Sequence, residues 1–338
     1  MSERTLLQER LVGIVRRFRQ RKVVVLGDAI ADQFIYGGIS RVSREAPVFI
    51  LRHESTETVP GGAANCALNL AALGASVSLI AVTGTEEAGT SLLEKLSSAG
   101  VDCRGVIVSQ EMRTTTKVRI LAGQAHSTRQ QVIRIDYEGN ESINASVREQ
   151  LRKNVLEQAQ AADALIISDY NYGVADPDMA IFARDTATKR KIATLVDSRF
   201  RLQSMPGFTS ATPNSDEVEQ LLGAGTSELA QLEVAAEDLR KRLSYRALLV
   251  TRGSHGMMLV EAGVPPLHIG PVGSREPVDV TGAGDTVVAT YALALASEAS
   301  FPDAARLANY AGGLVVMKRG TSCVTAPELE YSVLQSPL

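Results

Sequence analysis

Residues 279–285, with the sequence DVTGAGD, join an extended segment to a long apolar run. The preceding residues 276–278 contain Pro277 and favour an extended backbone, whereas residues 286–296 are rich in Ala and Leu and suit a buried helix. The glycines allow a tight turn, and the first turn of a helix leaves backbone N–H groups unpaired. Because such a helix start attracts anions, the stretch predicts an anion site where a strand turns into a helix.

Asp285 is the candidate catalytic residue of this stretch. It falls in the first turn of the expected helix, where it is placed to accept a proton from a hydroxyl that attacks a bound phosphoryl group. The alternative is a simple helix cap, since acidic residues are common in first turns. A P-loop is excluded because the motif lysine is missing, and Val287 stands where a dinucleotide fingerprint needs glycine.

Composition excludes several classes of protein. The 338 residues are 45% hydrophobic and 22% charged, as in ordinary globular chains, and the net charge of −3 gives no attraction to nucleic acid or to anionic membranes. Cys66, Cys103 and Cys323 show neither metal-ligand spacing nor a disulfide framework. No apolar run has the length of a membrane span, and no signal peptide is recognisable, so we expect a cytoplasmic protein.

Apolar strands alternate with amphipathic helices along most of the chain, which predicts an α/β fold with a parallel sheet. Two of these strands, residues 22–28 and 164–169, end in Asp28 and Asp169. Ligands of open α/β sheets bind at the carboxyl ends of the strands, so we expect both carboxylates near a substrate, with Asp28 as a candidate ligand for sugar hydroxyls. The alternative for Asp28 is a turn cap.

Two segments interrupt this alternation, at about 34–55 and 112–137. Both carry short alternating patterns typical of paired strands, so we expect a small β insertion assembled from separated parts of the chain. Lys117, Arg119 and Arg134 share alternation parity within their strands and therefore predict a basic face. Such a face suits an anionic substrate group, although a solvated polar face explains the same pattern.

A run of small residues follows the first of these segments. Residues 60–74 begin with Pro60-Gly61-Gly62 and suit a helix packed closely on a sheet, with Gly74 as its C-cap. The paired glycines let the backbone approach a ligand, and Asn65 lies at the same end of the helix. A plain glycine loop is the alternative.

Four motifs in this order resemble those of the ribokinase-like (PfkB-type) sugar kinases. The resemblance covers essentially the whole chain and implies one three-layer α/β/α sandwich over residues 1–338, with a mostly parallel central sheet and a small β lid. The motifs are Pro60-Gly61-Gly62-x-x-Asn65, Thr212-Pro213-Asn214-x-x-Glu217, Thr251-Arg252-Gly253 and the stretch from Asp279 to Asp285.

The resemblance implies ATP-dependent phosphorylation of a sugar, with Mg²⁺. Asp285 matches the base, and the N–H groups of Gly282, Ala283 and Gly284 match the anion hole for the γ-phosphate. The lid is expected to close over the sugar and to form a homodimer contact. The other implied roles are sugar contacts for Asp28, Gly61, Gly62 and Asn65, water-mediated Mg²⁺ binding for Asn214 and Glu217, nucleotide binding for Thr251 and Gly253, and K⁺ support for Asp279 and Thr281.

Within this family the chain is most similar to bacterial heptose-7-phosphate kinases of lipopolysaccharide precursor synthesis, notably in residues 41–48, 116–119 and 130–136. This implies phosphorylation of D-glycero-β-D-manno-heptose 7-phosphate to the 1,7-bisphosphate, with the lid cations on the 7-phosphate. Two lysines of that group are missing: residues 169–173 read DYNYG in place of DYGKG, and residues 197–200 read DSRF in place of DPKG. Another sugar kinase, for example one acting on fructose 1-phosphate, and a catalytically silent sugar- or nucleotide-binding regulator are the alternatives.

Overall fold

The computed structural model describes residues 3–123, 129–139, 143–223, 228–273 and 276–335. Residues 124–128, within the expected lid segment 112–137, lie outside the described residues. Among the helices that the described ranges contain, none is long and apolar enough to cross a bilayer.

The main sheet has eight strands, and those at its centre are parallel, which confirms the expected α/β class. Among the described strands of this sheet, only the β12–β13 and β13–β14 pairings are antiparallel, and they lie at one end. In spatial order the strands are β14 (Leu267–Ile269), β13 (Met257–Glu261), β12 (Ala247–Thr251), β11 (Ser210–Ala211), β10 (Ala193–Ser198), β9 (Ala164–Asp169), β1 (Lys22–Gly27) and β4 (Ser76–Ile80).

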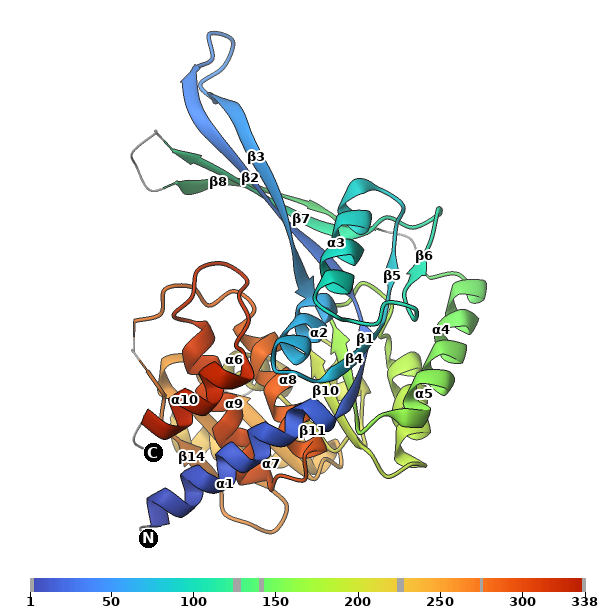
Figure 1. Cartoon of the computed structure of the whole chain (residues 1–338), viewed down its shortest axis with the longest axis vertical. Coiled ribbons are helices and arrows are strands. Elements are labelled where there is room, and N and C mark those ends of the chain that lie inside the picture. Colours follow the sequence, from blue (N-terminus) through green and yellow to red (C-terminus); the bar gives the residue numbers. More distant parts are fainter. Residues whose placement is uncertain (1–2, 124–128, 140–142, 224–227, 274–275, 336–338) are drawn as a thin grey trace.

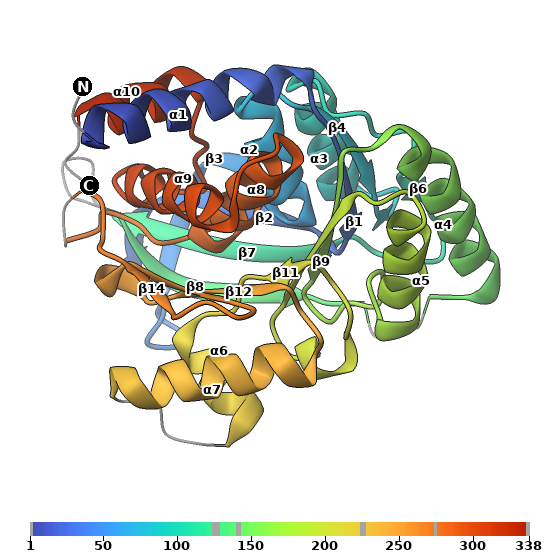
Figure 2. The ribbon, with the colours of Figure 1, turned by 90° about the horizontal axis from the view of Figure 1, so that it is seen from below.

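Helices cover both faces of this sheet (Figure 2). Each face of the sheet has its own hydrophobic core, and successive residues of β1 point alternately into the two. Val23 and Val25 pack in one core, and Val24 and Leu26 pack in the other. The first layer is α1 (Glu3–Arg17), α2 (Ala63–Ala72), α3 (Glu87–Ser98), α8 (Ala283–Ala296), α9 (Phe301–Val315) and α10 (Ala326–Gln335). The second layer is α4 (Ala145–Gln158), α5 (Pro177–Thr188), α6 (Ser215–Leu222) and α7 (Leu229–Arg242).

A second sheet of four strands projects from this body (Figure 1). We call it the lid sheet; it consists, in spatial order, of β3 (Phe49–Gly62), β2 (Ala29–Val42), β7 (Thr115–Gly123) and β8 (Gln130–Tyr137). A separate two-stranded ribbon pairs β5 (Val82–Thr83) with β6 (Ile107–Val108).

The first two lid strands are longer than the expected segment 34–55. β2 begins at Ala29, next to the end of β1, and β3 runs to Gly62, where α2 begins. Pro60-Gly61-Gly62 therefore closes a strand, whereas the sequence pattern placed it at the start of a helix. The change of direction occurs at Gly62, whose φ of 56° lies in the left-handed region that glycine tolerates.

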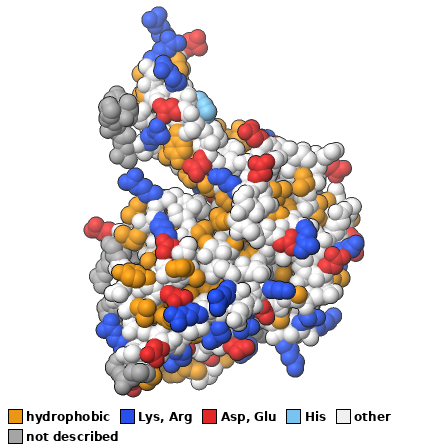
Figure 3. All heavy atoms as spheres, viewed as in Figure 1, with side chains coloured by type: hydrophobic (Ala, Val, Ile, Leu, Met, Phe, Trp, Pro, Cys, Tyr) orange, Lys and Arg blue, Asp and Glu red, His pale blue; other side chains and the backbone are white. Residues whose placement is uncertain are grey.

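The lid sheet exposes several large apolar side chains along its length. Figure 3 shows it rising from the body with hydrophobic and basic side chains on its surface. An exposed apolar surface on a projecting sheet is typical of a contact region. The exposed apolar residues are Ile39 and Val42 on β2, Phe49 and Ile50 on β3, and Val132, Ile133, Ile135 and Tyr137 on β8.

Candidate active site

Asp285 lies buried in the first turn of α8, with 3% of its surface exposed. Both carboxylate oxygens accept hydrogen bonds: Asn65 Nδ2 donates to Oδ2 over 2.8 Å, and the Tyr170 hydroxyl donates to Oδ1 over 2.9 Å. Burial raises the pKa of Asp285 to about 6, while these two hydrogen bonds and the charge of Lys117 act against that rise. The result is a carboxylate that is ionised at neutral pH and basic enough to accept a proton.

A buried polar network continues from Asn65 into α2 and α8. Asn69 Nδ2 donates to the backbone oxygen of Asn65 over 2.9 Å and to its Oδ1 over 3.1 Å, and the Thr286 hydroxyl donates to Asn69 Oδ1 over 2.9 Å. Asn65, Asn69 and Thr286 are all fully buried. Because each amide is held by the next, the Asn65 donor has a fixed direction toward Asp285.

The expected turn before α8 is present, but the expected strand before it is not, because residues 276–280 are irregular. Gly282 has a φ of 76°, and a Cβ atom at this position would lie only 2.5 Å from Asn65 Nδ2. Ala283 N–H, one of the three donors expected in the anion hole, already donates to the Val280 oxygen over 3.2 Å within the turn. At Gly284 a Cβ would meet nothing within 4 Å, so open space lies above the start of the helix.

A cavity of about 210 Å³ adjoins this turn. Its wall brings Thr251 and Gly253, the expected nucleotide residues, together with Ala283 and Gly284 of the expected anion hole. Mostly apolar walls of this kind suit a flat aromatic ring. The apolar side chains of the wall include those of Met257, Pro277, Val280, Val287 and Val316.

Asn214 and Glu217 are hydrogen-bonded to each other at the start of α6. Glu217 N–H donates to Asn214 Oδ1 over 2.8 Å, and Asn214 N–H donates to Glu217 Oε2 over 2.9 Å, which forms a capping box. A backbone bridge pairs Asn214 with Thr251, so these two sequence motifs lie side by side. Burial raises the pKa of Glu217, although the charge of Arg199 lowers it.

The Asp279 carboxylate joins the turn before α8 to the turn at Gly320 through hydrogen bonds. Its Oδ1 accepts from Thr281 N–H over 2.9 Å, and its Oδ2 accepts from Gly320 N–H over 3.0 Å. Burial alone raises the pKa of Asp279, but these N–H donors lower it below its usual value. Asp279 and Thr281, the expected K⁺ pair, are thus in contact with each other.

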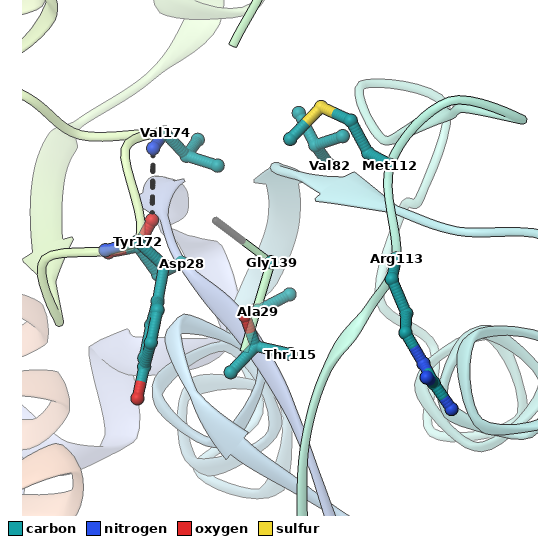
Figure 4. Close-up of a pocket in the computed structure, with 9 residues that line it drawn as sticks. All are labelled: Asp28, Ala29, Val82, Met112, Arg113, Thr115, Gly139, Tyr172 and Val174. Carbon is teal, nitrogen blue, oxygen red and sulfur yellow. Dashed lines mark hydrogen bonds between the residues drawn. The ribbon is translucent and has the colours of Figure 1, made fainter. Parts of the chain in front are cut away.

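Asp28 holds the loop that follows β9. Its carboxylate accepts three backbone hydrogen bonds, from Tyr170 N–H over 2.8 Å, Tyr172 N–H over 3.0 Å and Val174 N–H over 3.0 Å. Figure 4 shows the hydrogen bond from Val174 N–H to the Asp28 carboxylate at the wall of a small cavity. Although these donors act against it, burial raises the pKa of Asp28 to about 6. The observed role is loop support, and a sugar contact stays a prediction.

Asp169, the other carboxylate at a strand end, is enclosed by polar partners. It pairs with the guanidinium of Arg201, and it accepts hydrogen bonds from the Ser198 hydroxyl over 2.6 Å and from Asn171 N–H over 3.0 Å. Its side chain has no exposed surface. Asp169 therefore stabilises the strand ends of β9 and β10, and direct substrate binding by it stays a prediction.

Comparison with known proteins gives the family of this site. The profile of the pfkB family carbohydrate kinases matches residues 20–328. The chain belongs to the pfkB family of carbohydrate kinases. It is 42% identical over 320 residues to "Bifunctional protein HldE" of Hahella chejuensis and 41% identical over 318 residues to the protein of the same name from Pseudomonas aeruginosa. Each alignment covers 94% of this chain but 64% of the relative, so the chain spans about two thirds of their length.

Solved structures of pfkB-type kinases share this fold. An Arabidopsis thaliana ribokinase complexed with ribose and ATP gives a TM-score of 0.69 at 22% identity, covering 93% of this chain and 98% of that one. Phosphofructokinase-2 from Escherichia coli in complex with potassium gives a TM-score of 0.76 at 21% identity, with the same coverage. The ribokinase-like fold expected from the sequence is thereby confirmed.

The lid sheet of this pfkB kinase presents a charged face to the active site. Strand register places Asp32 beside Lys117, Lys117 beside Asp136, and Arg119 beside Arg134. We call Asp32, Lys117, Arg119, Arg134 and Asp136 together the charged lid face. The Lys117 ammonium lies 5.9 Å from the ring centre of Tyr170 and 5.6 Å from that of Tyr172, so this face meets the loop after β9.

Two of the three expected lid cations already have acidic partners. Arg119 pairs with Asp32, and Arg134 makes a two-pronged contact with Asp136 at 2.7 Å for both hydrogen bonds. Lys117 is half-buried, and burial lowers its pKa. The face therefore carries both signs of charge, whereas the alternation of residues predicted a basic face.

Asp32 and Tyr170 also belong to the site, although neither was predicted from the sequence. Asp32 is buried on β2 beside Gly61, where a Cβ would come within 2.4 Å of Asp32 Oδ2, and its charge raises the pKa of Asp285. An acidic residue at a buried strand position was the available signal. Tyr170 carried no comparable signal, because its contact with Asp285 joins positions 115 residues apart.

Proposed function

We propose that this carbohydrate kinase transfers the γ-phosphoryl group of ATP to a sugar phosphate, with Asp285 as the base. The observation that carries the proposal is the position of Asp285, buried in the first turn of a helix whose start lines the cavity of Thr251, Gly253 and Gly284. The sugar hydroxyl attacks the γ-phosphorus as the bond to the leaving ADP breaks, and its proton passes to the Asp285 carboxylate. Backbone N–H groups at the start of α8 stabilise the phosphoryl charge.

The residues present fit the cations that the family implies. Mg²⁺ usually keeps several waters and binds through one or two carboxylates and the substrate phosphates. Glu217 supplies such a carboxylate beside Asn214, and it also stands near the guanidinium of Arg199. For K⁺, Asp279 brings residues 281 and 320 together, and the Thr321 hydroxyl oxygen is buried without a hydrogen-bond partner within the described residues. An oxygen of this kind suits a monovalent cation.

For the sugar we propose D-glycero-β-D-manno-heptose 7-phosphate, phosphorylated at its anomeric hydroxyl. The support is the sequence resemblance together with the charged lid face, where Lys117, Arg119 and Arg134 outnumber Asp32 and Asp136. A phosphate can draw Arg134 away from its exposed pairing with Asp136, since such surface pairs contribute little. Arg119 pairs with the buried Asp32 and is held more firmly.

We also propose that the lid sheet closes over the sugar and pairs with that of a second copy. Closure excludes water from the phosphoryl group and so limits ATP hydrolysis. The exposed apolar residues on β2, β3 and β8 support a contact between two lids. Sedimentation of the parent protein and of Phe49→Glu tests it, because a charge on this face should convert a dimer to a monomer.

The experiment that tests the function is ATP consumption by the purified chain across a small panel of sugars. The panel contains the heptose 7-phosphate, fructose 1-phosphate, fructose 6-phosphate, ribose and fructose, each with Mg²⁺ and with or without K⁺. Turnover confined to the heptose phosphate supports the full proposal. Turnover on another sugar keeps the kinase and reassigns its substrate. No turnover on any sugar, with ATP still bound, favours a silent regulator.

A further inference from the structure

The hydroxyl of Tyr170 occupies one oxygen of the proposed base. It donates to Asp285 Oδ1 over 2.9 Å, while Asn65 occupies Oδ2. Asn65 is fully buried and accepts a hydrogen bond from Asn69, whereas Tyr170 extends from a loop and is partly exposed, although its hydroxyl is buried. Of the two partners of Asp285, the tyrosine is thus the one that can give way.

The loop of Tyr170 is fixed at its backbone and contacted by the lid at its ring. Asp28 accepts the N–H of Tyr170 over 2.8 Å, which anchors the main chain. The Lys117 ammonium, on the charged lid face, lies 5.9 Å from the centre of the Tyr170 ring. The side chain therefore joins the catalytic carboxylate to the lid, and a sugar that enters beneath the lid meets it.

We infer that Tyr170 is a positioning residue that caps Asp285 in the free enzyme and is replaced by the sugar hydroxyl when substrate binds. The inference rests on the proposed role of Asp285 as the base. With Tyr170 in place, Oδ1 already accepts a hydrogen bond and is a poorer acceptor for a water proton. The sugar hydroxyl takes over that hydrogen bond, so the base becomes available only when the correct acceptor is present.

The cap has a chemical purpose in a kinase. Water is always present and can attack the γ-phosphorus in place of the sugar, giving inorganic phosphate and ADP, with its proton passing to the same carboxylate. With one side-chain donor on each oxygen, fewer lone pairs of the Asp285 carboxylate are left to accept a hydrogen bond from water. Tyr170 thereby reduces ATP hydrolysis before the sugar arrives, in addition to the exclusion of water by a closed lid.

Other charged and titratable groups surround Asp285 and remain in place when Tyr170 is changed. The carboxylates near it disfavour its ionised form, and Lys117 favours it. If the pKa of Asp285 changes when Tyr170 is substituted, the change can therefore be assigned to the lost hydroxyl. These groups are Asp32 on β2, Cys66 on α2, Lys117 on β7, Asp197 on β10 and Cys323 before α10.

The test compares Tyr170→Phe with Tyr172→Phe in the full chain. The control removes a hydroxyl from the same loop, but that hydroxyl donates to Glu138 and not to Asp285. With Mg²⁺ and ATP alone at pH 8, we expect Tyr170→Phe to raise phosphate release by roughly 3–10-fold, as for one lost hydrogen bond. Tyr172→Phe should release phosphate at the parent rate.

The pH profiles give a second readout that a merely structural role would not move. kcat/KM reports the free enzyme and kcat the substrate complex. In Tyr170→Phe the acid limb of kcat/KM should move up by about half to one pH unit, because a hydrogen bond to the ionised form is lost. The acid limb of kcat should remain at the pH of the parent enzyme, because the sugar hydroxyl has already replaced the tyrosine in the substrate complex.

The two proposals fail in different ways. Tyr170 is not a replaceable cap if the acid limbs of kcat/KM and kcat shift together in Tyr170→Phe. The same conclusion follows if neither limb shifts and phosphate release is unchanged. Asp285→Asn examines the base itself: an Asn variant that retains turnover overturns the proposed mechanism whatever Tyr170 does. Melting temperatures of both tyrosine variants, compared with the parent, show that the folded protein is being measured.

Discussion

Asn65 Nδ2 donates a hydrogen bond to Asp285 Oδ2 over 2.8 Å, although 220 residues separate the two positions. The contact joins the helix that follows the lid strand β3 to the helix that carries the base. It also explains the glycine at position 282, where a Cβ would lie 2.5 Å from the same amide. Two sequence motifs at opposite ends of the chain are therefore parts of one hydrogen-bonded unit.

Removal of the base should abolish transfer without loss of the nucleotide site. In Asp285→Asn the side chain keeps its size but no longer accepts a proton, so we expect kcat to fall by about 10²-fold or more. ATP affinity, measured by calorimetry, should stay near that of the parent because the cavity beside Thr251 and Gly253 is untouched. Near-normal turnover in this variant contradicts the mechanism.

The rate should depend on pH through Asp285. Its pKa is raised to about 6 by burial, and only the ionised form accepts a proton. We therefore expect kcat/KM to be level above pH 7 and to fall by about tenfold for each pH unit well below pH 6. An acid limb near pH 4, typical of an exposed carboxylate, would show that another group is the base.

Gly282→Ala and Gly284→Ala should differ although they lie two positions apart. The first places a Cβ against Asn65 at a φ of 76°, so we expect unfolding free energy to fall by about 1–3 kcal/mol. The second adds a methyl group in open space within a helix, so stability should be kept. It should nevertheless weaken ATP binding, because Gly284 lines the cavity. Equal losses of stability in urea titrations refute this distinction.

Asp28→Ala separates loop support from sugar contact. The substitution leaves three backbone N–H groups of residues 170–174 without their acceptor, and we expect the free energy of unfolding to fall by about 2 kcal/mol or more. Chemical denaturation measures this loss directly. If stability is unchanged while the KM for the sugar rises, the carboxylate acts on the substrate and not on the loop.

The lid cations should distinguish phosphorylated from neutral sugars. Arg134→Ala removes a charge from the face above Tyr172, so KM for a sugar phosphate should rise about tenfold or more, and KM for a neutral sugar should barely change. Arg129→Ala is the matched control, because Arg129 is a lid cation that pairs with Glu54 instead. Equal effects of Arg134→Ala on both sugars remove the reason to place a phosphate there.

The sequence predicted those parts of the site that lie within one local motif. The glycine turn and Asp285 are adjacent in the chain, and backbone chemistry alone relates them to an anion site. The partners of Asp28 and Asp169 were not predictable in this way. Both carboxylates do lie at strand ends, but whether they meet a ligand or a backbone N–H depends on how a distant loop folds. The same reason hid Tyr170, since no spacing rule links it to α8.

The lid boundary was missed for a different physical reason. Short alternating patterns predicted strands within 34–55. The pairing of β2 with β3, however, already begins at Ala29 and Gly62, and the first paired residues are buried where the lid sheet joins the body. Strands buried on both faces lose the alternation that marks a half-exposed strand. The pattern therefore identified the exposed half of each strand and not the buried half.

The continuity of β3 with α2 limits how lids can be exchanged between kinases of this family. Strand β3 ends at Gly62, α2 begins at Ala63, and Asn65 already binds the base. A chimaera joined at Gly62 would connect a foreign strand to the native helix α2. The junction would then lie next to Asn65, whose side chain must keep its direction toward Asp285. A transplant that preserves catalysis should be joined within the outer halves of β2 and β3, so that α2 and its amide remain with the parent body.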